Sequence, residues 1–299
     1  MTKNWNDLPD DMKEMVVDNM DIFTRFRLKM CSKSDKRLVE SVPLYCDEIT
    51  ATKISYGVNL HIEDVVVSYS DSYVWIYNGR TQKRRDIVVS GEKEGHEMVK
   101  KMFSVMMSHR DACIGCFNTN LKIDDLLPTP YFKIHVKHLK LGRNKRQDIL
   151  KWLDAIVEQP DQLTIETLSP PVLKNVNRLK NTNEGLIDSD LMKLKVSKVH
   201  INQTNISANG LREYVEKLIK EDYPIGAVME FSNTEQWRIP HDWLKYEQLD
   251  DNNEDDNNYT IFKYYKGRVV MSKEKEIIID RIYAIKPRLF IKLSILKRY

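Results

Sequence analysis

The apolar residues between Trp5 and Val42 constrain the fold most, because they recur at helical spacing rather than at the alternating spacing of strands. Pro9 stands at an expected first helical position, where its missing N–H costs nothing, and two aspartates follow where the helix dipole favours negative charge. The spacing predicts a helix with four apolar side chains on one face, namely Met12, Met15, Val16 and Met20.

Two further short helices are expected before Pro43. Asp21 and Ser34 are suitable N-caps for them. The second helix would carry Ile22, Phe26 and Met30 along one stripe, and the third would carry Leu38, Val39 and Val42. Three short helices do not use this many apolar positions in packing on one another, so a docking surface is expected.

These residues resemble the F-box family, whose N-terminal helices dock on the Skp-type adaptor of SCF (Skp, cullin, F-box) ubiquitin ligases. The matching segments are Leu8-Pro9, the first-helix positions Met12, Val16 and Met20, and the run from Phe26 to Lys33. The resemblance implies an adaptor-binding set made of Leu8, Pro9, Met12, Val16, Met20, Phe26, Leu28 and Met30. The alternative from the residues alone is a three-helix cap that packs on its own domain.

Composition restricts the class of protein. The apolar fraction of 41% is enough for a sizeable core, and 47 basic against 44 acidic residues give a net charge of +3, too balanced for a dedicated nucleic-acid binder. No apolar run of about 18 residues occurs, and the N-terminus does not have the pattern of a signal peptide. We expect an intracellular protein, cytoplasmic or nuclear, whose four cysteines are reduced.

After the helices, the polar stretch from Pro43 to Thr50 is expected to connect two parts of the chain. Residues 54–89 alternate β-branched and aromatic residues with polar ones, which predicts three or four short strands. Asn78-Gly79 favours a hairpin, since both residues tolerate positive φ. Residues 91–110 have helical spacing.

Beyond Leu126 the chain repeats a strand followed by an amphipathic helix. The expected strand cores are 136–141, 163–165, 194–196 and 228–231, and the expected helices are 146–158, 170–180 and 207–220, the last with Ser207 as its cap. Each crossover has room for a helix, so neighbouring strands can pair in parallel. An irregular, leucine-rich-repeat-like domain is expected, and one compact α/β sheet is the alternative.

A second resemblance lies in the C-terminal part. Thr234–Arg238 and Phe262–Gly267, with the strand-helix units before them, are similar to the FTH domain that follows the F-box in nematode F-box proteins of the F-box A type. The acidic run Asp250–Asn258 is expected to be a loop, and Ile277–Tyr299 to form strands.

The predicted fold class is therefore α/β, or α+β overall. The predicted domains are a helical F-box at 1–47 and an FTH-type domain at 48–299, with strands at 50–110, strand-helix repeats at 126–246 and terminal strands at 259–299.

Motifs that would indicate metal binding, nucleotide binding or catalysis are weak. Cys113-x2-Cys116 and His135-x2-His138 have zinc-ligand residue types, but their separation departs from zinc-finger spacing, and two histidines three apart on one strand face opposite ways. No phosphate-binding glycine loop occurs, and no cysteine lies in a catalytic signature. Two basic clusters, Lys83-Arg84-Arg85 and Arg143/Lys145/Arg146, lie at a strand end or before a helix. They are interpreted as solvated loops, and a nuclear signal or a phosphate contact is the alternative.

The sequence thus favours a substrate-recognition subunit of an SCF-type ligase, which binds a Skp-type adaptor and, through it, a cullin-RING complex. Residues 8–38 would bind the adaptor, and the part after residue 50 a protein target at an unknown site. No enzymatic activity, cofactor, metal, membrane or nucleic acid is expected. The alternatives are an α/β interaction protein that works outside any ligase, with RNA bound through its basic clusters, and a cysteine enzyme.

The first prediction concerns metal. Chelation should leave the melting temperature of the purified protein unchanged, because a structural zinc site contributes folding free energy outright. Elemental analysis should give less than about half an equivalent of zinc per chain. A stoichiometric zinc content would reverse the rejection of the Cys113 and Cys116 pair.

Overall fold

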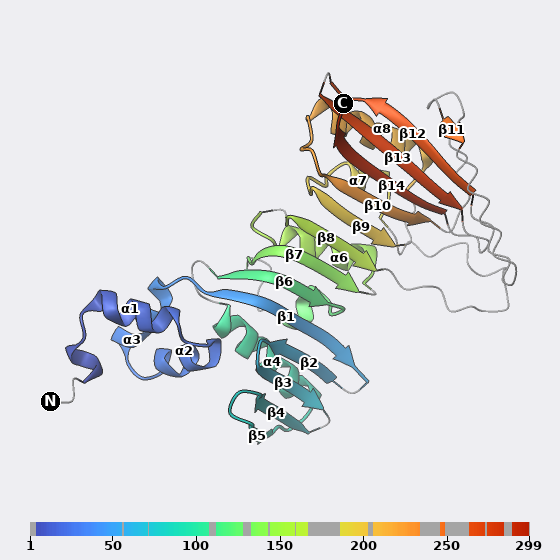
Figure 1. The fold of residues 1–299 in the computed structure, drawn as a ribbon. Coiled ribbons are helices and arrows are strands. Elements are labelled where there is room, and N and C mark those ends of the chain that lie inside the picture. The colour runs from blue at the N-terminus through green and yellow to red at the C-terminus, as the bar shows by residue number, and fades with distance from the viewer. Residues whose placement is uncertain are drawn as a thin grey trace, which may run out of the picture. The chain divides into compact units, whose positions relative to one another are not determined.

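The computed structural model shows helices at the N-terminus, followed by strands and further helices, so the predicted α/β class is confirmed (Figure 1). The chain divides into two compact units, residues 1–140 with 150–160, and residues 141–149 with 161–299. Each unit is described by itself. The described residues are 4–55, 57–70, 72–107, 112–127, 133–142, 144–158, 160–166, 186–202, 206–233, 246–248, 263–272, 274–283 and 289–298.

The N-terminal helices lie close to their predicted positions. They are a 3-10 turn η1 (Trp5–Asp7), α1 (Asp10–Asp18), α2 (Ile22–Lys29) and α3 (Lys33–Ser41). Asp21 caps α2 as predicted, since its carboxylate accepts the Thr24 N–H at 2.8 Å. The prediction for α3 was wrong by two residues, because Ser32 and not Ser34 accepts the Asp35 N–H. Pro9 precedes α1 as its N-cap instead of opening the helix.

The first unit contains a mixed sheet in the order β5-β4-β3-β2-β1-β6-β7. Its strands are β1 (Tyr45–Ile54), β2 (Gly57–Ile62), β3 (Val65–Ser70), β4 (Tyr73–Asn78), β5 (Lys83–Val88), β6 (Cys113–Thr119) and β7 (His135–Gly142). Strands β1 to β5 pair antiparallel with their chain neighbours, whereas β1 pairs in parallel with β6, Ile49 lying opposite Phe117. Strand β1 thus occupies an inner position in this sheet.

The predicted connection up to Thr50 was wrong, because strand β1 begins at Tyr45. Its polar residues are interspersed with fully buried Cys46, Ile49 and Ala51, and the Leu44 carbonyl accepts the Cys113 N–H at 2.8 Å. The boundary at residue 47 stays a prediction. The hairpin between β4 and β5 is confirmed, with Asn78 paired to Lys83, but the positive φ of 53° belongs to Gln82 and not to Asn78 or Gly79.

Helix α4 (Glu92–Met106) confirms the prediction for residues 91–110 and packs on β2, β3 and β4. Gly95 allows the close approach, since a Cβ there would lie 2.0 Å from the Tyr69 ring. Aromatic rings continue the core, in which Phe117 stacks on Phe103 and meets Trp152 edge-on, with ring centroids 6.1 and 5.3 Å apart. The Trp152 indole donates to the Leu121 carbonyl at 2.9 Å, which satisfies its buried N–H.

Two other helices accompany the first unit. Helix α5 (Ile123–Leu126) packs against α4. Helix α6 (Arg146–Asp154) confirms the helix predicted at 146–158 and ends four residues early, and its residues from 150 onward belong to this unit.

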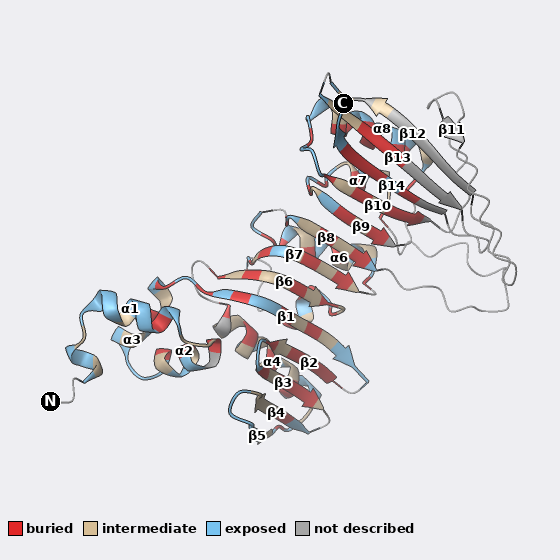
Figure 2. Ribbon diagram, in the orientation of Figure 1, coloured by how far each residue is buried: buried red, intermediate tan, exposed pale blue. Residues whose placement is uncertain are grey.

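Figure 2 shows the buried positions as bands along the strands, as expected for a sheet covered on one face.

The second unit has a mixed sheet in the order β8-β9-β10-β14-β13-β12-β11. Strands β8 (Gln162–Glu166), β9 (Lys198–Asn202) and β10 (Val228–Asn233) are parallel neighbours, and α7 (Asp188–Leu191) and α8 (Ala208–Lys220) lie in the crossovers. Strands β11 (Tyr246–Gln248), β12 (Lys263–Val270), β13 (Lys275–Tyr283) and β14 (Leu289–Lys297) complete it in antiparallel pairs. The parallel strand-helix pattern and the terminal strands are confirmed.

One strand of the repeat was misplaced, since β9 begins at Lys198 and not at Leu194. Leu194 and Val196 are buried, but the Leu194 carbonyl accepts the Lys217 ammonium at 2.6 Å and the Tyr223 hydroxyl at 3.2 Å. Side chains therefore occupy an acceptor that a strand would offer to its neighbour. The Ser207 cap is confirmed by its 2.9 Å bond from the Gly210 N–H.

Several predicted features lie outside the described residues. They are the helix at 170–180, the motif Thr234–Arg238 and the acidic run Asp250–Asn258. In the part of the chain that is described, no helix has the length and apolar character needed to cross a membrane.

The early start of β1 leads to a prediction about fragments. A fragment of residues 48–299 lacks Leu44 and Cys46, whose side chains are 3% and 1% exposed, whereas a fragment of residues 43–299 keeps both. Burial of such side chains contributes about 2 kcal/mol or more, so the shorter fragment should melt at least ~4 °C lower by circular dichroism. Equal melting temperatures would show that the start of β1 contributes nothing to stability.

Candidate protein-binding surface of the N-terminal helices

The three N-terminal helices share a small internal cluster. Val17 from α1 and Val39 from α3 are fully buried there with Val42. Trp5, Met20, Leu28 and Leu38 pack around this centre. Val17, which the predicted stripe did not include, is thus the fully buried position of α1. Of the stripe only Met20 packs against the cluster, and Met12, Met15 and Val16 are exposed.

A buried arginine joins the ends of the helices. Arg25 of α2 is 3% exposed, and its guanidinium donates to the backbone carbonyls of Asp18 at 2.9 Å, Met20 at 3.2 Å and Pro43 at 2.7 Å. The same guanidinium reaches the Asp18 carboxylate at 3.4 Å. The planar fork of arginine can serve several acceptors at once, so it satisfies carbonyls at the end of α1, in the turn and at the exit of the domain.

The start of α3 is fixed by a second polar group. The Ser32 hydroxyl donates to the Asp35 carboxylate at 2.7 Å, and the Trp5 indole donates to the other oxygen at 2.8 Å. These two hydrogen bonds lower the pKa of Asp35, with Ser32 contributing most. The stabilisation is therefore present above the unfolded-state pKa of about 3.9 and is lost as pH falls through the lower folded pKa.

What remains outside is an apolar surface. Met12, Met15, Val16 and Met30 are 51%, 68%, 42% and 72% exposed. Figure 2 shows α1 as mostly exposed along its length. Three large apolar side chains on α1 and one just after α2 exceed the scattered exposure that needs no explanation, so these four side chains, which we call the methionine patch, are the candidate for partner binding.

The predicted adaptor-binding residues fall into three groups. Pro9, Met12, Val16 and Met30 are exposed, Leu8 and Phe26 are half-buried, and Met20 and Leu28 pack against the internal cluster. The set as a whole stays a prediction. Met15 was absent from it, although its place three residues after Met12 on the same helical stripe could have indicated it.

Among the described residues, Cys116 and His138 do not form an activated pair. Cys116 Sγ and His138 Nδ1 approach to 3.9 Å. Burial raises the pKa of the Cys116 thiol, and burial together with the Lys140 charge lowers the pKa of His138. Both shifts favour the neutral thiol and neutral imidazole, whereas a nucleophilic cysteine needs a thiolate. Within the described residues no three potential ligands converge as a metal site.

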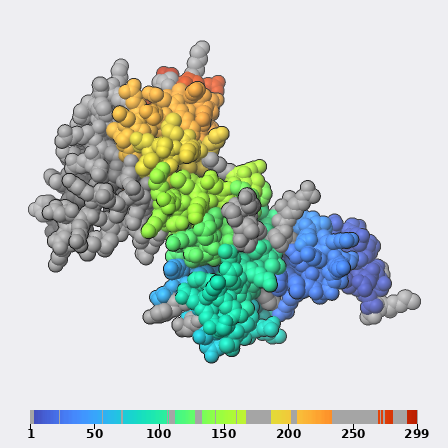
Figure 3. Space-filling view, turned by 180° about the vertical axis from the view of Figure 1, so that it is seen from behind, coloured from blue at the N-terminus to red at the C-terminus, as the bar shows by residue number. Residues whose placement is uncertain are grey.

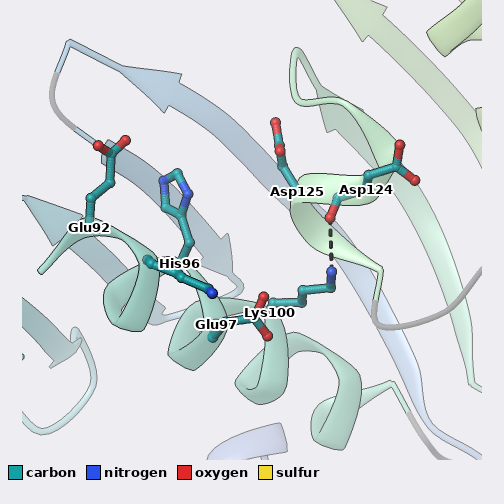
Figure 4. A pocket seen from close by; sticks show the side chains of 7 residues that line it. Glu92, His96, Glu97, Lys100, Asp124 and Asp125 are labelled. Carbon is teal, nitrogen blue, oxygen red and sulfur yellow. Dashed lines mark hydrogen bonds between the residues drawn. The ribbon is translucent and has the colours of Figure 1, made fainter.

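A cavity of about 420 Å³ lies between α4 and α5. Figure 4 shows His96 and Lys100 on α4 facing Asp124 and Asp125, and the Lys100 ammonium donates to the Asp124 carbonyl at 2.9 Å. Glu92 and Glu97 complete its charged rim. Mixed charges of this kind are typical of a solvated surface, and they supply neither a nucleophile nor an apolar floor.

Two segments of the chain match known protein families. Residues 5–47 match the F-box domain, and residues 94–235 match a family described as a domain of unknown function, DUF3557. The chain thus has a segment that matches the F-box domain followed by one that matches DUF3557, which confirms the predicted arrangement of an F-box followed by a C-terminal domain. F-box proteins are adaptor subunits rather than enzymes, and the F-box supports a general role as an SCF-type substrate adaptor.

The chain is also similar to a protein that is named as an F-box protein. The chain is 23% identical over 257 residues to the uncharacterized F-box protein T20B12.4 of Caenorhabditis elegans, a match that covers 73% of this chain and 67% of that protein. No solved structure matches the chain.

The role of Arg25 can be tested by Arg25→Lys. One ammonium cannot reach three carbonyls in different directions, so the free energy of unfolding should fall by ~1–3 kcal/mol in urea titrations. Arg37→Lys on the exposed side of α3 is the matched control and should change it by less than ~0.5 kcal/mol. If the two variants were equally stable, Arg25 would not hold the helix ends together.

Proposed function

We propose that the protein is a substrate-recognition subunit of an SCF-type ubiquitin ligase, in which the N-terminal helices bind a Skp-type adaptor and the part after residue 50 holds a protein target. The methionine patch is the observation that carries this proposal. It lies within the segment that matches the F-box domain, and it is apolar where an isolated helical cap would be polar.

The patch has the energetic capacity for a stable interface. Covering a fully exposed Met or Val side chain is worth about 1.5–3 kcal/mol, so these four partly exposed side chains can together contribute several kcal/mol to the free energy of binding. Methionine also adapts its shape to a partner, because its side chain is unbranched. The half-buried Leu8 and Phe26 would border the patch at the interface.

The connection to the sheet supports the adaptor role. The F-box continues into β1 without a spacer, since Arg25 binds the Pro43 carbonyl and the strand begins at Tyr45. Arg80, between β4 and β5, also lies 3.5 Å from the Asp21 carboxylate and 3.2 Å from that of Asp64. A target held on the first unit would therefore keep a fixed position relative to the adaptor. In Figure 3 the blue N-terminal helices project from the teal part of this unit, so a partner can reach them.

The adaptor interface is tested by Met12→Ala with Val16→Ala. Both side chains are exposed, so the fold should be unaffected, whereas the lost contacts should weaken binding of a purified Skp-type adaptor by ~10-fold or more in calorimetry. Leu8→Ala with Pro9→Ala should also weaken binding.

Ile225→Ala provides the matched control, because Ile225 is 50% exposed and lies outside the F-box. It should bind the adaptor like the unmodified protein. Unchanged binding in the Met12 and Val16 double variant would contradict the proposed interface, and failure of the unmodified protein to bind any Skp-type adaptor would contradict the proposed function.

A further inference from the structure

Strand β5 is the terminal strand of the first unit's sheet. It pairs with β4 on one side and is last in the strand order (Figure 1). Five of its six residues are exposed, and Ile87 is half-buried. The basic cluster Lys83–Arg85, interpreted from the sequence as a loop or strand end, is therefore part of a strand with an open edge.

The direction of the backbone groups of β5 follows from one hydrogen bond. The Val89 N–H donates to the Ser72 carbonyl at 2.9 Å, and hydrogen-bonded pairs alternate with non-bonded pairs along an antiparallel ladder. Continuing this alternation makes Ile87 and Arg85 the bonded partners of β4. The N–H and C=O groups of Arg84, Asp86 and Val88 consequently point away from β4, and no residue among those described forms a hydrogen bond with them.

The side chains give this edge a polarity. Its first half is basic, and the Arg84 guanidinium lies 5.3 Å from the centre of the Trp75 ring and 2.7 Å from the Asp86 carboxylate. Lys83 and Arg85 form no ion pair with any described residue. Its second half is apolar, since Val88 is 74% exposed next to Ile87.

These charges select the strand that can pair. A bare edge would accept any extended chain, but a second copy of β5 paired in parallel register would place like charges opposite each other, which disfavours that pairing. An acidic strand meets no such repulsion. Its main chain would bond to the outward groups of β5 while its side chains pair with Lys83 and Arg85.

We propose that the edge of β5 is a target-docking site that binds an extended acidic segment of a protein as an added strand. Acidic residues of the segment would lie beside Lys83–Arg85, and an apolar residue beside the exposed Val88. This inference rests on the proposed function and names the chemistry of the target. Nucleic acid, which is also anionic, is the competing ligand that the test distinguishes.

The test begins with phage-displayed random peptides of about eight residues, selected on the full-length protein. Selected peptides should be enriched in Asp and Glu together with β-branched residues. Fluorescence anisotropy of a labelled selected peptide then measures affinity. Lys83→Glu with Arg85→Glu should weaken binding at least ~10-fold. Lys93→Glu with Lys101→Glu makes the same change of charge on exposed positions of α4 and should leave the affinity within ~2-fold.

A second pair of variants tests the main-chain contact. Val88→Pro removes an outward N–H without removing a bond to β4, and an edge strand tolerates this proline. It should weaken binding at least ~5-fold more than Val88→Ala, which keeps the N–H. The selected peptide with alternate backbone nitrogens methylated should also bind at least ~5-fold more weakly to the unmodified protein. This measurement tests the main-chain contact even if Val88→Pro does not fold.

Three results would overturn the proposal. They are selected peptides without acidic residues, equal affinity of the charge-reversed variant, and equal affinity of the methylated peptide. A labelled oligouridine that displaces the peptide, with affinity falling steeply with salt, would assign the edge to nucleic acid instead. Adaptor binding by the charge-reversed variant distinguishes failure of the β5 docking site from failure of the ligase function. If the variant still binds the adaptor but no longer binds the peptide, the proposed ligase function is not contradicted.

Discussion

The joint between the N-terminal helices and the sheet depends on the guanidinium of Arg25. Helix ends leave carbonyls without partners, and three carbonyls at changes of chain direction converge on this one side chain. A buried charge is tolerated only when its hydrogen-bonding capacity is used, and several backbone acceptors meet that condition. Because one acceptor belongs to Pro43, the same group that closes the helices also directs the chain into β1.

This joint explains how two different surfaces coexist in one unit. The internal cluster around Val17 leaves Met12, Met15 and Val16 of α1 exposed, together with Met30 after α2, and these are the side chains of the methionine patch. The sheet buries alternate residues under α4, and its last strand has little to bury because no further strand follows it. The methionine patch is apolar and suits a partner that stays bound. The edge of β5 is charged and suits a partner that must dissociate.

Local signals in the sequence predicted much of the fold. Helical spacing located α1, α4, α6 and α8, and alternation located most strands, since each signal depends only on which side of an element is buried. The start of β1 was missed because Asp47 and Glu48 make that stretch polar, although their neighbours are buried. The role of Arg25 could not be predicted, because a charged residue in an amphipathic helix is normally on the solvent side. The order of strands, and thus the open edge at β5, depends on long-range pairing that local patterns do not encode.

The exposure of β5 has an evolutionary consequence. Substitutions at exposed positions change stability by only a few tenths of a kcal/mol, so Lys83, Arg84 and Arg85 can each be replaced with little effect on folding. The positions around Arg25 and Val17 have no such freedom, because their side chains satisfy buried groups or fill the interior. Duplicated copies of such a gene could therefore diverge rapidly along this strand while retaining one common helical module, and each copy would acquire its own preference without first regaining a stable fold.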